Sequence, residues 1–396
     1  MSSRRSAARR QTVRRRRTVA LLAVPIAAVI AVASVSGQRD GPSRASTARR
    51  GSVGVLAARA RRAPHQHRHG ASSTGVSKNL RSGSNADVLP GPVLIADRDN
   101  NRLLEVSPNG HVLWRFPAPG DLPRGQTFEL PDDAFFSPNG RKIVVTQEDD
   151  FVISVVDFAR DRILYRYGHP GVPGSEPGYV HNPDDAMLMP SGDLLSADIK
   201  NCRVLVIRPP AHRPLRQLGE TGVCEHQLGV SYGSPNGAFP MAGGDTAITE
   251  INGDWLDVIA PDGTPVLNMH PPGFTYPSDT NQVRPGLFLS VDYTNPGAIE
   301  TFTNTGELRW RYEPTGGAAL NQPSLALPLS NGDILANDDK NDRVIVVDPR
   351  TNRIVWQYGH THVPGSGEGF LSNPDGVDLA PPYSLDERFS STLRAP

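Results

Sequence analysis

The sequence predicts an all-β fold, a six-bladed β-propeller with four strands in each blade. Three observations support it: a repeat of near-constant length, tight turns at fixed places within the repeat, and an incomplete unit at each end. In each repeat a proline and two further residues precede an apolar strand, and the steps between prolines are 52, 52, 42, 46 and 51 residues. Repeats of this length that consist of short strands are typical of propellers. The prolines are Pro131, Pro183, Pro235, Pro277, Pro323 and Pro374.

Each repeat has the same order of strands and turns. In the unit that begins at Pro183, an apolar stretch over 186–189 is followed by a Ser191-Gly192 turn, a second strand over 194–197 and a third over 203–207. Asn-Gly and Ser-Gly pairs supply the positive φ that tight hairpins need. A fourth strand follows and contains a large aromatic residue. These aromatic residues are Trp114, Tyr165, Trp310 and Trp356.

The two ends of the repeat region complement each other. Residues 93–116 supply strands two to four of a unit that lacks a first strand, and residues 373–381 read as a first strand with nothing after it. Paired, they complete one blade and remove two exposed sheet edges. We therefore predict the propeller over residues 89–382, with a short tail at 383–396.

The charges divide the chain into two parts. Residues 1–70 hold 16 arginines and one acid, so the remainder has 25 of the 41 basic residues and 40 of the 41 acidic ones, a net charge of −15. An acidic domain repels nucleic acid, so we expect no nucleic-acid partner.

The N-terminal segment, residues 1–36, combines a basic cluster at 14–17 with an almost wholly apolar run that we predict to form a hydrophobic helix. The run is just long enough to span a membrane, and Ala31-Val32-Ala33 resembles a signal peptidase site. The segment is therefore either a cleaved signal peptide or an anchor that crosses the membrane through residues 18–35. Either way the positive-inside rule places the propeller outside the cytoplasm, secreted or attached to the cell membrane by a single pass.

Residues 37–88 are rich in Ser, Arg and Gly with few large apolar side chains, so we predict a disordered linker. His65, His67 and His69 within it are a candidate metal-binding run, with a solvated tract as the alternative.

The chain has two cysteines, Cys202 and Cys224. An even pair in an exported protein predicts a disulfide, and two free thiols are the alternative.

Three turns carry a shared motif. The segments 97–102, 198–203 and 338–343 each run from an Asp through an Asn to an Arg, and in this they resemble the NHL repeat. The other blades depart from the pattern: Gln147 stands at the acid position in blade two, and Glu250 and Asp292 lack the arginine. The resemblance implies the propeller fold and leaves the activity open.

Two further resemblances concern the fourth strand. Asp348, Thr351 and Trp356 are similar in spacing to the pyrroloquinoline-quinone-type (PQQ-like) repeat, where the Trp packs on the next blade; six blades make quinone binding unexpected. A Trp-x-Tyr followed by a Pro-Asp strand is also similar to arylsulfotransferase-like propellers, which use a histidine nucleophile. The nearest histidines to that role are His181 and His169.

The residues just after the repeated prolines are expected to converge at one mouth of the central channel. They are Asp132, Asp184, Asn236, Ser278, Ser324 and Asp375, with Asp133, Asp185 and Asp279 one position further on. Oxygen ligands at this density suit Ca²⁺, for which Asp132, Asp184 and Asp375 are the candidate ligands, or a cationic or polyhydroxyl ligand. The alternative is that these side chains only shape the turns into the strands.

Two other groups of polar residues have different expected roles. His181 precedes Pro183 by two residues, so beside Asp184 and Asp185 it is a candidate catalytic base; a surface histidine is the alternative. A second acidic series recurs at the end of the second strand, and we predict that it is architectural. Its members are Asp97, Asp198, Glu250, Asp292 and Asp338.

Together these features favour an exported binding module over an enzyme, with a small-molecule or protein partner outside the cytoplasm. The alternative is a propeller enzyme of the lactonase-like or arylsulfotransferase-like kind, with a metal or a histidine at the channel mouth. A scaffold that acts through its outer surface is a third possibility.

Overall fold

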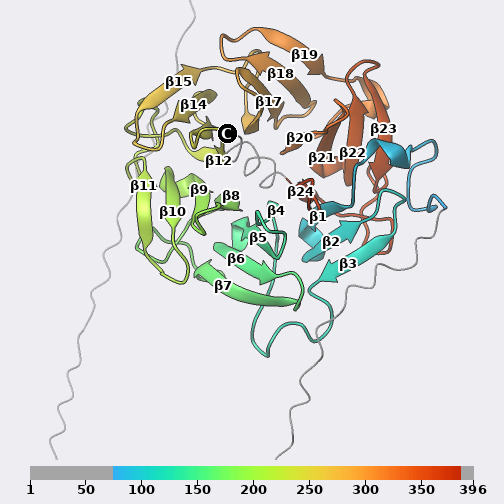
Figure 1. Ribbon diagram of the computed structural model, residues 1–396, viewed down its shortest axis with the longest axis horizontal. Coiled ribbons are helices and arrows are strands. Elements are labelled where there is room, and N and C mark those ends of the chain that lie inside the picture. The colour runs from blue at the N-terminus through green and yellow to red at the C-terminus, as the bar shows by residue number, and fades with distance from the viewer. Residues whose placement is uncertain (1–74, 385–396) are drawn as a thin grey trace, which may run out of the picture. The chain divides into compact units, whose positions relative to one another are not determined.

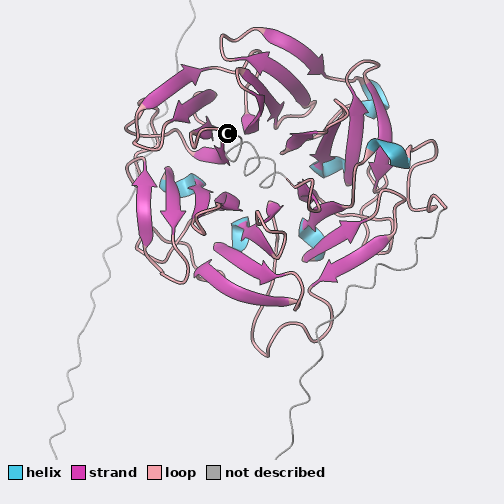
Figure 2. Ribbon diagram, in the orientation of Figure 1, coloured by secondary structure: helices cyan, strands magenta, loops and turns pink. Residues whose placement is uncertain are grey.

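The computed structural model describes residues 75–384, which form six four-stranded antiparallel sheets arranged around a central axis (Figure 1). The predicted N-terminal helix lies outside the described residues. Within them, no helix has the length and apolar character needed to cross a membrane. Helical structure in this part is confined to short 3₁₀ turns (Figure 2). They are η1 (Ala86–Val88), η2 (Arg98–Asn100), η3 (Glu148–Asp150), η4 (Ile199–Asn201), η5 (Gly316–Ala318) and η6 (Asp339–Asn341).

The first three blades follow the order of the chain, except for one strand that comes from the C-terminal region. Blade one consists of β24 (Pro374–Leu379), β1 (Val93–Asp97), β2 (Arg102–Val106) and β3 (Val112–Phe116). Blade two consists of β4 (Ala134–Phe136), β5 (Lys142–Gln147), β6 (Val152–Asp157) and β7 (Arg162–Gly168). Blade three consists of β8 (Pro183–Leu188), β9 (Leu194–Asp198), β10 (Arg203–Ile207) and β11 (Pro214–Leu218).

The other three blades repeat this order without exchange. Blade four consists of β12 (Pro235–Pro240), β13 (Thr246–Glu250), β14 (Trp255–Ile259) and β15 (Pro265–Met269). Blade five consists of β16 (Pro277–Arg284), β17 (Leu287–Asp292), β18 (Ala298–Thr303) and β19 (Leu308–Tyr312). Blade six consists of β20 (Ala326–Pro328), β21 (Ile334–Asp338), β22 (Arg343–Asp348) and β23 (Arg353–Tyr358).

The predicted ring closure is confirmed. Strand β24 pairs antiparallel with β1, so that Leu379 lies opposite Val93 and Val377 opposite Ile95. The two termini of the propeller therefore share blade one, and the pairing covers the edge of β1 that would otherwise be free to bind another strand.

Aromatic residues of the fourth strands fasten each of four blades to the next. Trp356 is fully buried, and its Nε1 donates to the Pro108 carbonyl of blade one over 2.8 Å. Trp114 and Trp310 also donate from Nε1, in their case to side-chain oxygens of the following blades, Asp161 Oδ1 and Asn352 Oδ1. Tyr165 OH donates to Ala211 O of blade three. These contacts match the packing role implied by the PQQ-like resemblance.

The last part of the segment predicted as a linker, residues 75–88, lies along the outer strand of blade six. Leu80 is buried and forms a β-bridge with Tyr358, and the Asn85 amide donates to the Val355 carbonyl over 2.8 Å. The outermost strand of a blade has unpaired backbone groups, and this segment satisfies some of them. Residues 37–74 lie outside the described part of the chain.

Candidate functional site

The six positions after the repeated prolines meet on the axis of the ring. The first strands of neighbouring blades contact one another around the centre (Figure 1). They enclose a cavity of about 110 Å³, and all six of these side chains line it. The complete lining is Asp132, Glu148, Asp184, Ile199, Asn236, Tyr276, Ser278, Tyr293, Ser324 and Asp375.

Arg98, which the sequence did not indicate, neutralises part of this cavity. Its guanidinium is buried and donates to Asp132 through Nη1, which also lies 3.2 Å from Asp375 Oδ2. Nη2 donates to Glu148 over 3.0 Å and to Asp149 over 2.6 Å. Burial opposes ionisation of Asp375, but Arg98 lowers the pKa of this carboxyl below its ordinary value.

The position of Arg98 is itself part of the repeat. It is the residue directly after the second-strand acid Asp97, and Glu148, Ile199 and Tyr293 occupy the same place in blades two, three and five. All three line the cavity. An alignment of the repeats at this position would have identified these residues as a second set that faces the axis. It would not have identified the residues that pair with Arg98.

One residue further along the first strands, Asp133, Asp185 and Asp279 form a deeper cluster. One carboxylate oxygen from each lies within 4.8 Å of the other two. All three side chains are at least 98% buried, and within residues 75–384 no donor reaches the Oδ1 atom of any of them. Burial, followed by repulsion between the carboxylates, raises the pKa of Asp133 and Asp279 well above the ordinary value. Burial raises the pKa of Asp185 to about 7.

Two of the six first strands carry glycine at this depth, and neighbouring backbone and side chains, the carboxylates included, approach both positions closely. A Cβ on Gly237 would lie 3.3 Å from Asp279 Oδ1, and one on Gly376 would lie 2.9 Å from Asp133 Oδ1. A buried carboxylate oxygen without a donor is costly, so either protons shared between the carboxyl groups or a bound cation must stabilise the cluster.

The three predicted calcium ligands, Asp132, Asp184 and Asp375, all line this cavity, but they differ in their partners. Arg98 already pairs with Asp132 and Asp375, whereas Asp184 groups with Asp132 and Asp133 within 4.8 Å. Within the described residues, Asp184 and the three aspartates one position further along the first strands form no ion pair with a cationic side chain. Asn236 remains in the cavity wall, and its Nδ2 donates to Ser278 Oγ over 3.0 Å.

His181 is placed away from the wall of the cavity. Its ring packs edge-on against Phe151, with centroids 5.7 Å apart, and its backbone amide donates to Asp198 Oδ1 over 2.7 Å. The His169 ring packs on Tyr179 instead. The geometry therefore brings neither histidine ring into the wall that Asp184 lines.

The second acidic series holds the loops that lead into the first strands. Asp198 accepts the amide of His181, and its Oδ2 accepts Arg203 Nε over 2.7 Å. Asp97 and Asp338 make equivalent pairs with Arg102 and Arg343. In every blade that has an acid at this position, the acid accepts a backbone amide of the preceding loop. The donors are Ser372, His181, Gly233, Tyr276 and Asn321.

Comparison with known proteins supports the fold. No protein-family model matches the sequence, and no curated protein matches it. A chain of the nidogen/laminin complex matches with a TM-score of 0.52 and 15% identity, and a protein of unknown function from Bacteroides caccae with 0.51 and 14%. Each alignment covers 73% of this chain and 98% of the other. At these identities the likeness shows the propeller fold alone, and it gives no support to the arylsulfotransferase-like resemblance.

Proposed function

We propose that this chain is an exported binding module and that its axis holds a divalent cation, Ca²⁺, between Asp133, Asp185 and Asp279. The observation that carries the proposal is the cluster of three buried carboxylates: one oxygen of each lies within 4.8 Å of the other two, and within the described residues the Oδ1 atom of each accepts no hydrogen bond. Asp184, which groups with Asp133, supplies a fourth carboxylate from the cavity side.

The charge balance of the axis favours a cation. Two ionised carboxylates 4.8 Å apart repel by about 3–4 kcal/mol at an effective dielectric constant of about 20. Arg98 forms ion pairs with some of the carboxyl groups near the axis. The eight carboxyl groups in this region are Asp132, Asp133, Glu148, Asp184, Asp185, Asp279, Asp339 and Asp375.

The geometry of the cluster suits calcium. Ca²⁺ binds six to eight oxygen atoms at about 2.3–2.6 Å, so oxygens on opposite sides of the ion lie up to about 5 Å apart. The 4.8 Å limit on the three carboxylate oxygens is within that range. The adjoining cavity contributes further hydroxyl and amide oxygens, from Ser278, Ser324 and Asn236.

The size of the cavity favours binding over turnover of a large substrate. Pockets for drug-sized ligands measure about 300–1,000 Å³, whereas this cavity measures about 110 Å³. It accommodates an ion with a few waters, or one small polar group of a partner. Tyr276 and Tyr293, whose rings lie 5.3 Å apart, line the same cavity and offer aromatic surface to such a group.

Export is supported by the cysteines. Cys202 and Cys224 form a disulfide with a Cα–Cα distance of 5.1 Å. Structural disulfides persist in oxidising compartments outside the cytoplasm, in keeping with the signal peptide or anchor predicted at residues 1–36.

The test is thermal unfolding of the full chain in chelator and in saturating Ca²⁺. Ion binding to the folded state alone adds about 2.7 kcal/mol at 100 times the Kd, so we expect the melting temperature to rise by several degrees. Asp279→Asn should abolish that rise and should cost the chelated protein little, because burial and the neighbouring carboxylates already disfavour a charge at Asp279. The matched control is Asp292→Asn, a buried acid of the same blade that accepts backbone amides. If Ca²⁺ does not raise the melting temperature of the parent protein, the cluster is stabilised by shared protons and the proposal is wrong.

A further inference from the structure

Blade four departs from the acid–arginine pattern of its neighbours. The register places Glu250 of β13 opposite Trp255 of β14, where blades one, three and six place an aspartate opposite an arginine. Because side chains alternate along a strand, Asp257 shares the face of Trp255, and Asn268 of β15 lies opposite Asp257. This face therefore carries the carboxyl groups of Glu250 and Asp257, and Trp255 occupies the position of the arginine in the other blades.

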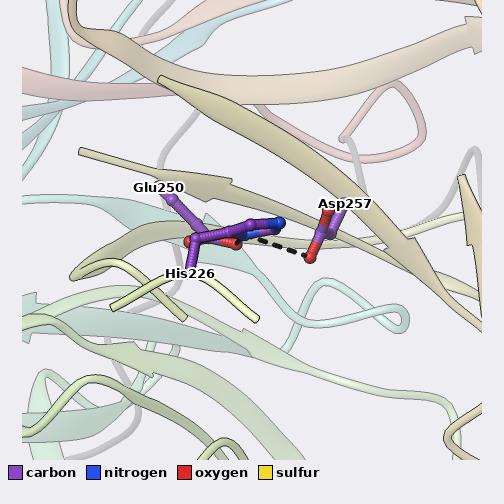
Figure 3. A group of neighbouring side chains, drawn as sticks. All are labelled: His226, Glu250 and Asp257. Atoms are coloured by element: carbon purple, nitrogen blue, oxygen red, sulfur yellow. Dashed lines mark hydrogen bonds and ion pairs between the residues drawn. The ribbon is translucent and has the colours of Figure 1, made fainter. Parts of the chain in front are cut away.

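His226, in the connection from β11 to β12, covers the two carboxyl groups (Figure 3). Its Nδ1 lies 2.9 Å from Glu250 Oε1 and 3.9 Å from Asp257 Oδ2. The imidazole stacks on Trp255 with centroids 4.2 Å apart and an interplanar angle of 14°. The stack fixes the plane of the ring, so that Nδ1 points between the two carboxylates.

In each carboxylate, one oxygen accepts a hydrogen bond from a neighbouring amide and the other oxygen lies near His226. Glu250 Oε2 accepts the Gly233 amide, and Asp257 Oδ1 accepts Asn268 Nδ2 over 2.8 Å. Asp257 Oδ2 is buried and receives no hydrogen bond from any residue of the described chain. Burial is the main cause that raises the pKa of Glu250 to about 8, and the neighbouring Asp257 carboxyl adds to it.

We infer that His226, Glu250 and Asp257 form a binding site for a first-row divalent metal, with Zn²⁺ as the best match. Zn²⁺ binds nitrogen and carboxylate oxygen at about 2.0–2.2 Å, so tetrahedral ligand atoms lie about 3.4 Å apart. The two distances from Nδ1, 2.9 and 3.9 Å, bracket that value. The site is independent of the proposed axial cation, and the nitrogen ligand distinguishes it from a calcium site.

Binding must displace protons. Zn²⁺ takes the place of the proton on Nδ1 and of any proton held by the carboxyl pair, and these protons pass to solvent. The imidazole then carries its hydrogen on Nε2, which lies 3.2 Å from Asn268 Nδ2. The same Asn268 Nδ2 donates to Asp257 Oδ1 over 2.8 Å, so metal binding requires this exposed side chain to rearrange beside the ring.

The test uses the full chain with His65, His67 and His69 replaced by Asn, because a histidine run binds Zn²⁺ on its own. Saturating Ca²⁺ is present throughout to occupy the axis. Calorimetric titration should show one equivalent of Zn²⁺, with proton release that depends on buffer ionisation. His226→Phe keeps the stack on Trp255 but removes the ligand nitrogen. Since losing an outer-shell partner costs about 10–100-fold in affinity, losing this ligand should cost at least about 100-fold.

A matched control and a spectroscopic readout separate ligation from unfolding. Glu300 is the buried acid at the position in blade five that corresponds to Asp257, and it pairs with Arg311. Glu300→Gln should therefore leave Zn²⁺ binding unchanged, whereas Asp257→Asn should weaken it. Co²⁺ should quench the fluorescence of Trp255, and Trp255→Phe should remove that quenching while Co²⁺ still binds.

Two results would overturn the inference. One is equal Zn²⁺ affinity in the parent and in His226→Phe, which would assign the binding to other residues. The other is a parent that binds no Zn²⁺ between pH 6 and 8, as expected if the carboxyl pair only shares a proton. The Ca²⁺ response of the axial cluster is measured separately, so failure here leaves that proposal untouched.

Discussion

Arg203 donates from Nε to Asp198 Oδ2 over 2.7 Å, across the turn that joins the second and third strands of blade three. The same arginine donates to the carbonyls of Ser175 and Tyr179 in the loop that precedes the blade. One buried ion pair therefore connects a turn to the loop that leads into the first strand of the same blade. The arrangement recurs at Arg102 and Arg343.

Replacing Arg203 by Met should destabilise the propeller strongly. It leaves Asp198 buried without its counter-charge, and breaking one side of a buried pair costs about 3–5 kcal/mol. The free energy of unfolding in urea measures the loss. Arg208→Met is the control, because the Arg208 side chain that pairs with Asp193 is 61% exposed, so its loss should have a smaller effect. Adding Asp198→Asn to Arg203→Met should recover part of the stability, because it removes the unpaired charge. If the double variant is no more stable than Arg203→Met, the loss comes from the packing of the arginine side chain.

Glu105 should make stability depend on pH. Burial raises its pKa from 4.5 to about 7. The folded state therefore favours the protonated form, and the stability this provides is complete below pH 4.5 and lost as the pH rises to about 7. Glu105→Gln should therefore raise the free energy of unfolding by about 1–3 kcal/mol at pH 8 and change it little at pH 4.5. Unfolding curves at both pH values test this, with the exposed Glu129→Gln as the control.

The Cys202–Cys224 disulfide should contribute measurably to stability. It closes a loop with a sequence separation of 22. Chain-entropy arguments give about 3 kcal/mol for a loop of this length. The double Cys→Ser variant should lose about that amount, and reductant should lower the stability of the parent to nearly the same level. A reductant that leaves the parent unchanged would show that the bond does not form or does not constrain the unfolded chain.

The tryptophans that fasten neighbouring blades should differ in importance. Trp356→Phe leaves the Pro108 carbonyl without its donor in a partly buried contact of a fully buried side chain, a loss of about 1–3 kcal/mol. Trp310 donates to Asn352 at an exposed site, where water replaces the lost bond. Trp310→Phe should therefore cost less. Equal losses, measured by denaturant unfolding, would show that ring packing and not the hydrogen bond sets the contribution.

The sequence predicted the framework because the framework is repetitive. The phase of the prolines located the first strands, and the missing strand at each end implied the pairing of β24 with β1. It also predicted which six side chains line the axis, since equivalent positions of a ring must converge.

The sequence could not predict interactions that cross between repeats. Arg98 sits in a turn of blade one, yet its partners belong to blade two and to β24, so no local pattern reveals them. The direction of the His181 ring is set by Phe151, a residue of the preceding blade. The packing of Leu80 on blade six likewise depends on a strand nearly 280 residues away.

The closure of blade one by β24 has a consequence for biosynthesis. Strand β1 ends at Asp97, and its partner ends at Leu379, so 282 residues separate the two. At about 5–20 residues per second, a ribosome needs about 15–60 s to produce the second after the first. During that time β1 has an unpaired edge. A ribosome that stalls anywhere before β24 therefore leaves a nascent chain with an open ring, in a state that chaperones and proteases recognise.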